Sequence, residues 1–239
     1  MLRRSRAVTL MLAGPLSLFA YHPLHAVAAP SHHGSTCDGI AVTKTVTSHS
    51  AHVVRGTSHR DVIKITASGH VVRAGRGNDV ICGSRGHDRI FGGAGNDTIL
   101  AGGGNDEVNG GSGSDDLNGG AGSDDINGGD GSDVENGGDG NDTLDGNAGD
   151  DTLDGNGGDD TENGGVGDDT ENGGSGDDTL EGNGGNDDLN GDGGDDSVDG
   201  GTGDDSEDGG TGTDDVSDSG NDDSGDSGDT SGGGGDAVR

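Results

Sequence analysis

An aspartate recurs at every ninth residue along most of this chain, and it is the side chain whose spacing most clearly predicts chemistry. Residues 74–217 divide into sixteen consecutive units of nine without insertion or deletion, and position six of every unit is Asp. Position four is Gly in every unit. Carboxylate and carbonyl oxygens suit Ca²⁺, which takes six to eight oxygen ligands in tolerant geometry. Mg²⁺ demands a tighter octahedron, and zinc prefers His or Cys. The repeat therefore predicts calcium binding.

The other positions of the unit indicate how these carboxylates are held. Frequent Gly at positions one, two and four permits positive φ and close backbone approach, as a tight turn requires. Positions seven to nine predict a three-residue strand, in which only position eight is regularly apolar (Ile, Leu or Val in twelve of sixteen units). Such a turn cannot bury enough to fold alone. We therefore expect successive turns to stack, with their oxygens around shared cation sites.

Composition excludes an ordinary globular core in this region. Only about 12% of residues 74–217 are Leu, Ile, Val or Phe, below the rough 20% under which a charged chain is expected to be disordered. The 239-residue chain carries a formal charge of −35, and 43 of its 47 acidic residues follow residue 90. Such a polyanion repels nucleic acid and anionic membranes, so its natural partners are cations.

The repeat also resembles a known family. Units such as Gly92–Leu100 (GGAGNDTIL) and Gly137–Asp145 (GGDGNDTLD) resemble the G-G-x-G-x-D-x-U-x repeats of RTX, or haemolysin-type, calcium-binding proteins. The resemblance implies an all-β fold, a right-handed parallel β-roll with two units per turn. It also implies several Ca²⁺ ions between neighbouring turns, held by the position-six Asp and by Gly carbonyls such as those of Gly93 and Gly95. The Asp ligands so implied are Asp79, Asp88, Asp97, Asp106, Asp115, Asp124, Asp133, Asp142, Asp151, Asp160, Asp169, Asp178, Asp187, Asp196, Asp205 and Asp214.

The start of the chain predicts export. Residues 1–28 have a basic beginning, a short apolar stretch and a small-x-small pattern ending at Ala28, which together indicate a cleaved signal peptide and a secreted protein without a membrane span. In an exported protein, Cys37 and Cys82 could form one disulfide, although two free thiols or an intermolecular bridge fit the count as well. The resemblance extends to family members with a leader Cys and a G-N-D-x-I-C-G segment, which implies a Cys37–Cys82 bond.

These patterns divide the chain into five parts. We expect the signal peptide (1–28), a leader segment (29–55), two degenerate entry repeats (56–73), the calcium-binding β-roll (74–217) and a disordered acidic Gly/Ser/Asp tail (218–239). In the second entry repeat His70 replaces the Asp. The leader alternates Thr, Val and Ala from Ile40 to Val46 and could form one or two strands.

Four units depart from the pattern because they carry Glu at the apolar position eight. A buried, unpaired carboxylate is costly, so we expect the roll to be firmest over residues 74–130 and looser beyond. Extra cation capacity and drift in a tolerant repeat array are both possible explanations, and drift is the simpler one. The residues concerned are Glu135, Glu162, Glu171 and Glu207.

No enzyme is predicted, since the chain contains neither H-E-x-x-H nor G-x-S-x-G. The favoured function is a secreted calcium-binding roll that folds on binding several Ca²⁺, with a scaffold, adhesive or buffering role. The alternative is a disordered acidic polyanion of the extracellular matrix or of mineral surfaces. A flat face for ice or carbohydrate is disfavoured, because the outward positions vary too much.

Overall fold

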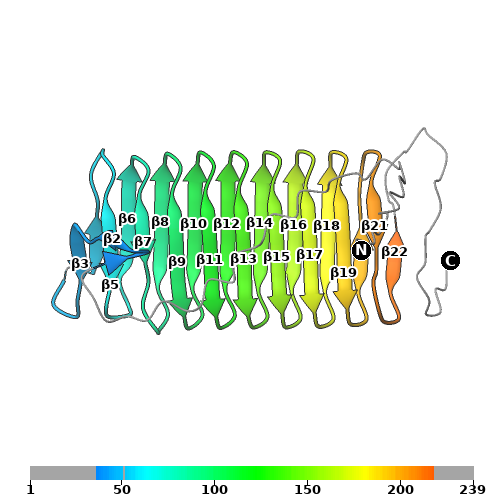
Figure 1. Cartoon of the computed structure of the whole chain (residues 1–239), viewed down its shortest axis with the longest axis horizontal. Coiled ribbons are helices and arrows are strands. Elements are labelled where there is room, and N and C mark those ends of the chain that lie inside the picture. Colours follow the sequence, from blue (N-terminus) through cyan, green and yellow to red (C-terminus); the bar gives the residue numbers. More distant parts are fainter. Residues whose placement is uncertain (1–35, 51, 218–239) are drawn as a thin grey trace, which may run out of the picture.

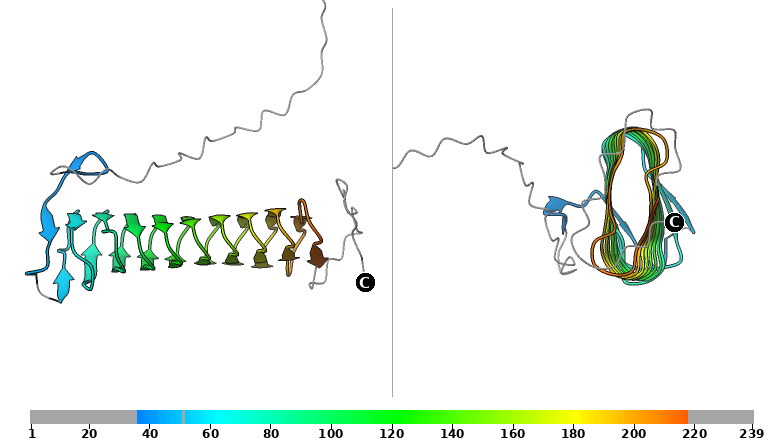
Figure 2. Two further views of the ribbon diagram at one scale, coloured as in Figure 1. Left: turned by 90° about the horizontal axis from the view of Figure 1, so that it is seen from below. Right: turned by 90° about the vertical axis from the view of Figure 1, so that its right-hand side faces the viewer.

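The described part of the chain is an all-β rod. The computed structural model describes residues 36–50 and 52–217, and within them every regular element is a strand. The strands run across the rod and stack along it (Figure 1). Seen along the rod, two sheets form the long walls of a flattened ring (Figure 2). The predicted all-β parallel β-roll is thus confirmed, with about ten turns.

Each long wall is a ten-stranded parallel sheet. The odd sheet consists of β3 (Lys44–Val46), β5 (Val62–Ile65), β7 (Val80–Cys82), β9 (Thr98–Gly103), β11 (Asp116–Ala121), β13 (Val134–Asp139), β15 (Thr152–Gly157), β17 (Thr170–Ser175), β19 (Asp188–Gly193) and β21 (Ser206–Asp208). The even sheet consists of β4 (Val53–Arg55), β6 (Val71–Arg76), β8 (Arg89–Ala94), β10 (Glu107–Ser112), β12 (Asp125–Asp130), β14 (Thr143–Ala148), β16 (Thr161–Val166), β18 (Thr179–Gly184), β20 (Ser197–Asp199) and β22 (Asp215–Ser217).

The register shows that two nonapeptides make one turn. Val108 of β10 pairs with Ile126 of β12, eighteen residues later, and the same offset holds along both sheets from β5 onward. Most strands have six residues instead of the predicted three, because they continue through positions one to three of the next unit. Those positions still bond to neighbouring strands, which leaves only Gly-x-Asp at the turn.

The turn geometry explains why glycine recurs. Gly111 and Gly113, at positions two and four, have φ of +115° and +122°. A side chain there would also meet the carbonyl oxygens of Gly93 and Gly95 in the preceding turn. Where position two is Asn or Asp instead, it also lies in the left-handed region, as at Asn147 (φ +70°), because these residues tolerate that conformation better than others; Ser84 is the exception and does not adopt it.

The interior is filled by position-eight side chains from both sheets. One apolar cluster runs from Val46 to Leu153, and a smaller one comprises Leu180, Leu189 and Val198. The sheet register does not change at residue 130, where we expected the roll to loosen, and six-residue strands continue to β19. The strands shorten to three residues only from β20 onward.

The N-terminal end is closed by a disulfide and a small apolar cluster outside the odd sheet. A short antiparallel pair, β1 (Thr36–Cys37) and β2 (Ile40–Ala41), lies against β5 and β7. Cys37 and Cys82 form a disulfide, as the family resemblance implied. The rest of the cluster is Val62, Val80 and Leu100, with Ile40 and Val42 packed against it.

The sheets begin earlier than the predicted roll. Lys44–Val46 and Val53–Arg55, within the predicted leader, already form the first strand of each sheet, and the entry repeats supply the next. The leader alternation therefore reflects strand formation. The predicted signal peptide and acidic tail lie outside the described residues.

Candidate metal centre

The position-six aspartates form two columns, one along each edge of the flattened roll. Aspartates eighteen residues apart follow each other in a column, and one column precedes the odd strands while the other precedes the even strands. In each column the Oδ1 atom accepts a hydrogen bond from the backbone N–H of the Asp one turn earlier. For example, Asp115 N–H donates to Asp133 Oδ1 at 2.7 Å. The columns therefore hold each carboxylate in one fixed orientation.

These carboxylates are buried. Fourteen of the sixteen, from Asp79 to Asp196, expose no more than 3% of their surface, and Asp205 and Asp214 in the last turns are half-buried. The second oxygen of nearly every one, usually Oδ2, has no hydrogen-bond partner among the described residues. A buried charged oxygen without a donor is costly, so these atoms call for a cation or a proton.

Backbone carbonyls supply the other oxygens. Gly93 and Gly95 are the residues whose carbonyl oxygens were predicted to bind calcium. These oxygens point toward the glycines one turn further on, Gly111 and Gly113. No N–H within the described residues donates to the Gly95 carbonyl, so it is a free acceptor at the turn. In the turn at Gly185, the Gly167 carbonyl and Asp187 Oδ1 approach the same point. Carboxylates and free carbonyls of successive turns thus face one another.

Burial raises the pKa of these aspartates. Burial, with a smaller contribution from neighbouring aspartates of the same column, raises the pKa of Asp106 and Asp115 to about 7. Burial is also the main reason why the pKa of Asp97, Asp142 and Asp151 rises to about 6. The hydrogen bond from the preceding turn opposes the rise without cancelling it. At neutral pH the columns therefore hold closely spaced negative charge that positive charge would stabilise.

The donor set distinguishes between metals. No group of three or more His, Cys, Asp and Glu side chains is assembled in the described part of the chain. Any ion at the turns must therefore combine one or two carboxylates with backbone carbonyls. Such an all-oxygen set of mixed donors fits calcium and does not fit zinc.

A second column of polar side chains at position five was missed from the sequence. Its oxygens accept backbone N–H groups from the following turn, as Asp159 Oδ1 does from Asp177 at 3.1 Å. This column runs in the opposite direction to the position-six column. The signal for it was the nearly constant short polar residue (Asn, Ser or Asp) before each position-six Asp. From Asp150 onward this residue is mostly Asp, so the later turns carry two adjacent carboxylates.

With this geometry in place, the comparison with known families is decisive. Four consecutive copies of the RTX calcium-binding nonapeptide repeat match residues 71–99, 100–135, 136–171 and 172–207, more than half of the chain. The chain belongs to the RTX calcium-binding repeat family, which is defined by its repeats and is not an enzyme family. Calcium ions are accordingly its indicated partners.

No curated protein sequence matches this chain. Among the described residues there is also no helix long and apolar enough to cross a membrane.

Proposed function

We propose that the chain is a secreted calcium-binding protein whose roll folds when Ca²⁺ ions occupy the stacked turns, and that the calcium-loaded rod has a scaffold, adhesive or buffering role outside the cell. The observation that carries this proposal is the pair of buried aspartate columns. In them, almost every carboxylate keeps one oxygen without a hydrogen-bond donor, and in several units a glycine carbonyl of the next turn lies near that oxygen.

The charge distribution supports coupling of folding to calcium. Residues 92–217 contain no Lys or Arg, so no basic side chain within the later turns can offset the aspartates. Burial of one apolar side chain per strand is a weak driving force for so charged a segment. Free energy of calcium binding would therefore become free energy of folding.

The proposal of an extracellular location is supported by the Cys37–Cys82 disulfide, since such bonds persist mainly in oxidising compartments. The calcium range that extracellular modules sense, about 0.1–1 mM, is the range expected here. The position-six aspartates from Asp79 to Asp214 are the proposed side-chain ligands.

A calcium titration of the purified full chain tests the proposal, followed by circular dichroism and by calorimetric stoichiometry. We expect a cooperative gain of β-structure near 0.1–1 mM and saturable uptake of several ions. An unchanged spectrum at about 10 mM CaCl₂ contradicts calcium-coupled folding, and weak graded uptake that fades with salt indicates a plain polyelectrolyte.

A matched pair of triple variants identifies the ligands. The test variant replaces three neighbours of one column, Asp124→Asn, Asp142→Asn and Asp160→Asn. The control removes the same charge from three exposed aspartates and consists of Asp125→Asn, Asp130→Asn and Asp139→Asn. We expect fewer bound ions and at least a tenfold higher calcium midpoint for the test variant only. Equal effects in both variants would show that charge density alone attracts the calcium.

A further inference from the structure

Three of the four position-eight glutamates occupy core positions. Glu135, Glu162 and Glu171 expose at most 1% of their surface, and Glu207 is half-buried. Glu135 pairs in register with Leu117 on one side and Leu153 on the other, so it lies in a column of buried position-eight side chains whose nearest members are apolar.

Glu162 and Glu171 interrupt the interior from opposite walls. Glu162 belongs to β16 of the even sheet and Glu171 to β17 of the odd sheet. The longer apolar cluster ends at Leu153, before these residues, and the shorter cluster starts at Leu180, beyond them. The core is therefore divided by a layer of carboxylates.

Each glutamate turns one oxygen toward the aspartate of its own unit. A Cβ added to Gly155 would lie 2.5 Å from Asp160 Oδ2 and 2.8 Å from both Glu162 Oε1 and the carbonyl oxygen of Gly173. Three oxygens from two successive turns thus lie close together beside Gly155, and the absence of a side chain at residue 155 is what lets them approach one another.

The same convergence recurs in the other glutamate units. The Asp133 and Glu135 oxygens both lie 2.5 Å from the corresponding point at Gly128, and Asp169 and Glu171 lie at 2.6 and 2.7 Å from it at Gly164. In a unit with an apolar plug, such as the one beginning at Gly146, the aspartate and the carbonyl are present without a second carboxylate.

Nothing in the described structure neutralises most of these oxygens. Neither carboxylate oxygen of Glu135 or of Glu162 has a hydrogen bond of good geometry within the described residues, although the backbone N–H of Gly128 and of Gly155 lies close enough to lower the pKa of each somewhat against the larger rise caused by burial. Glu171 accepts one hydrogen bond, from the Gly164 N–H at 2.7 Å, and its other oxygen has none there. Two buried carboxylates this close repel each other unless a cation or a shared proton lies between them.

We propose that the position-eight glutamates are metal ligands: each completes an inward-facing site for a hard divalent cation with the Asp two residues earlier, and at Glu162 the Gly173 carbonyl of the next turn adds a third oxygen. Ca²⁺ is the cation that this all-oxygen set fits. The inference rests on the proposed calcium-dependent folding and adds to it a second class of sites within the roll, confined to the glutamate units.

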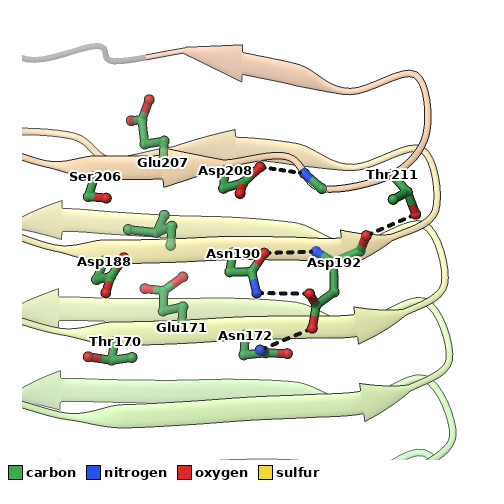
Figure 3. A pocket seen from close by; sticks show the side chains of 12 residues that line it. Thr170, Glu171, Asn172, Asp188, Asn190, Asp192, Ser206, Glu207, Asp208 and Thr211 are labelled. Carbon is green, nitrogen blue, oxygen red and sulfur yellow. Dashed lines mark hydrogen bonds between the residues drawn. The ribbon is translucent and has the colours of Figure 1, made fainter. Parts of the chain in front are cut away.

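A cavity near the C-terminal end lies beside two of these glutamates. Its lining includes Glu171 of β17, Leu189 of β19 and Glu207 of β21, together with outward-facing polar residues of the same strands. Figure 3 shows Glu171 and Glu207 at matching places on these strands, beside a hydrogen-bonded group of Asn172, Asn190 and Asp192.

The test counts bound Ca²⁺ by equilibrium dialysis of the calcium-loaded full chain. The variant carries Glu135→Leu, Glu162→Leu, Glu171→Leu and Glu207→Leu. Leucine is already the fully buried plug at Leu144 and Leu153, so the fold is expected to persist, and the calcium-loaded dichroism spectrum verifies it. The control is Glu181→Leu, which removes the same side chain from the exposed outer face of β18.

We expect the quadruple variant to bind three or four fewer Ca²⁺ ions than the wild type, with no change for Glu181→Leu. An unchanged number of ions in the quadruple variant, at whatever affinity, overturns the proposal and leaves the glutamates as drift. A wild-type chain that binds no calcium refutes the proposed function itself, so the two failures are distinguishable.

Discussion

Lowering the pH should fold the roll in the absence of calcium. This expectation follows from the raised pKa values of the aspartates in the two columns. Burial raises the pKa of Asp97, Asp142 and Asp160 to about 6 and that of Asp106 and Asp115 to about 7. An Asp in an unfolded chain titrates near 3.9, so the folded state binds protons more tightly than the unfolded state. The calcium-free roll therefore takes up protons as it folds.

The sign and the pH window follow directly. Because the folded pKa values lie above the unfolded one, the protonation-linked stability is fully present below about pH 4 and is lost as pH rises through 6 to 7. Two pKa units correspond to about 3 kcal/mol for each carboxyl group, and screening by solvent at the turns reduces this to roughly half. Eight aspartates have a folded pKa of about 6 or 7. Together they represent on the order of 10 kcal/mol, as much as the stability of a typical domain.

The assay is circular dichroism of the full chain in a calcium chelator, between pH 7.5 and pH 4.5, at low protein concentration with sedimentation to exclude aggregates. We expect a coil spectrum at pH 7.5 and a soluble β-spectrum that grows as pH falls below about 7, within the window set by these pKa values. The reasoning is refuted if the chelated chain has the same spectrum at both ends of this range.

Three further outcomes are expected. The double variant Cys37→Ser with Cys82→Ser should lose about 4 kcal/mol of stability in the calcium-loaded state, from the 45-residue separation of the cysteines, as measured by denaturant unfolding against wild type. Ile126→Ala, which empties a fully buried plug, should cost about 2–5 kcal/mol in the same assay, whereas Val166→Ala, at a position 68% exposed, should cost under about 0.5. Gly113→Ala should raise the calcium midpoint, because φ is +122° and the Gly95 carbonyl occupies the space of the new methyl group; a wild-type midpoint would contradict this account of the turn.

The repeat predicted most of the fold because its apolar position, its Asp and its glycines all indicate the same arrangement of strands and turns. One apolar residue in nine, a fixed Asp and turn glycines predicted stacked turns, and the family resemblance implied two units per turn, which the eighteen-residue register confirms. Strand length was underestimated because positions one to three were assigned to the turn on composition alone. In the structure their backbone groups still bond to neighbouring strands, since parallel pairing does not require side chains at those positions.

The start of the roll could not be located from the repeat. Lys44–Val46 and Val53–Arg55 lack the Gly and Asp of the unit, yet they pair in parallel with β5 and β6. Their contribution is backbone pairing and the buried side chains of Val46 and Val54, which extend the interior column by one turn. A sequence motif defined by turn residues cannot detect a turn that is built from strand residues alone.

The sequence predicted which aspartates form the candidate site, but it could not predict how their oxygens are hydrogen-bonded and buried. Counting nine residues locates Asp133 and Asp151, but only the structure shows that one oxygen of each is held by the preceding turn while the other is buried without a donor. The glutamate positions show the difference most clearly. From the sequence, Glu162 is a defect in a column of apolar plugs; in the structure its carboxylate faces the same point as Asp160 Oδ2.

These observations together indicate that the rod is built in two ways along its length. The N-terminal turns have an unbroken series of apolar plugs, an external apolar cluster and a disulfide, so they resemble a small conventional core. Beyond Leu153 the apolar interior is interrupted by Glu162 and Glu171, while the turns gain a second aspartate at position five. As hydrophobic stabilisation decreases along the chain, the number of carboxylate oxygens that could bind a cation increases. We therefore expect the later turns to depend most on cations, and the early turns to provide the ordered end on which they can stack.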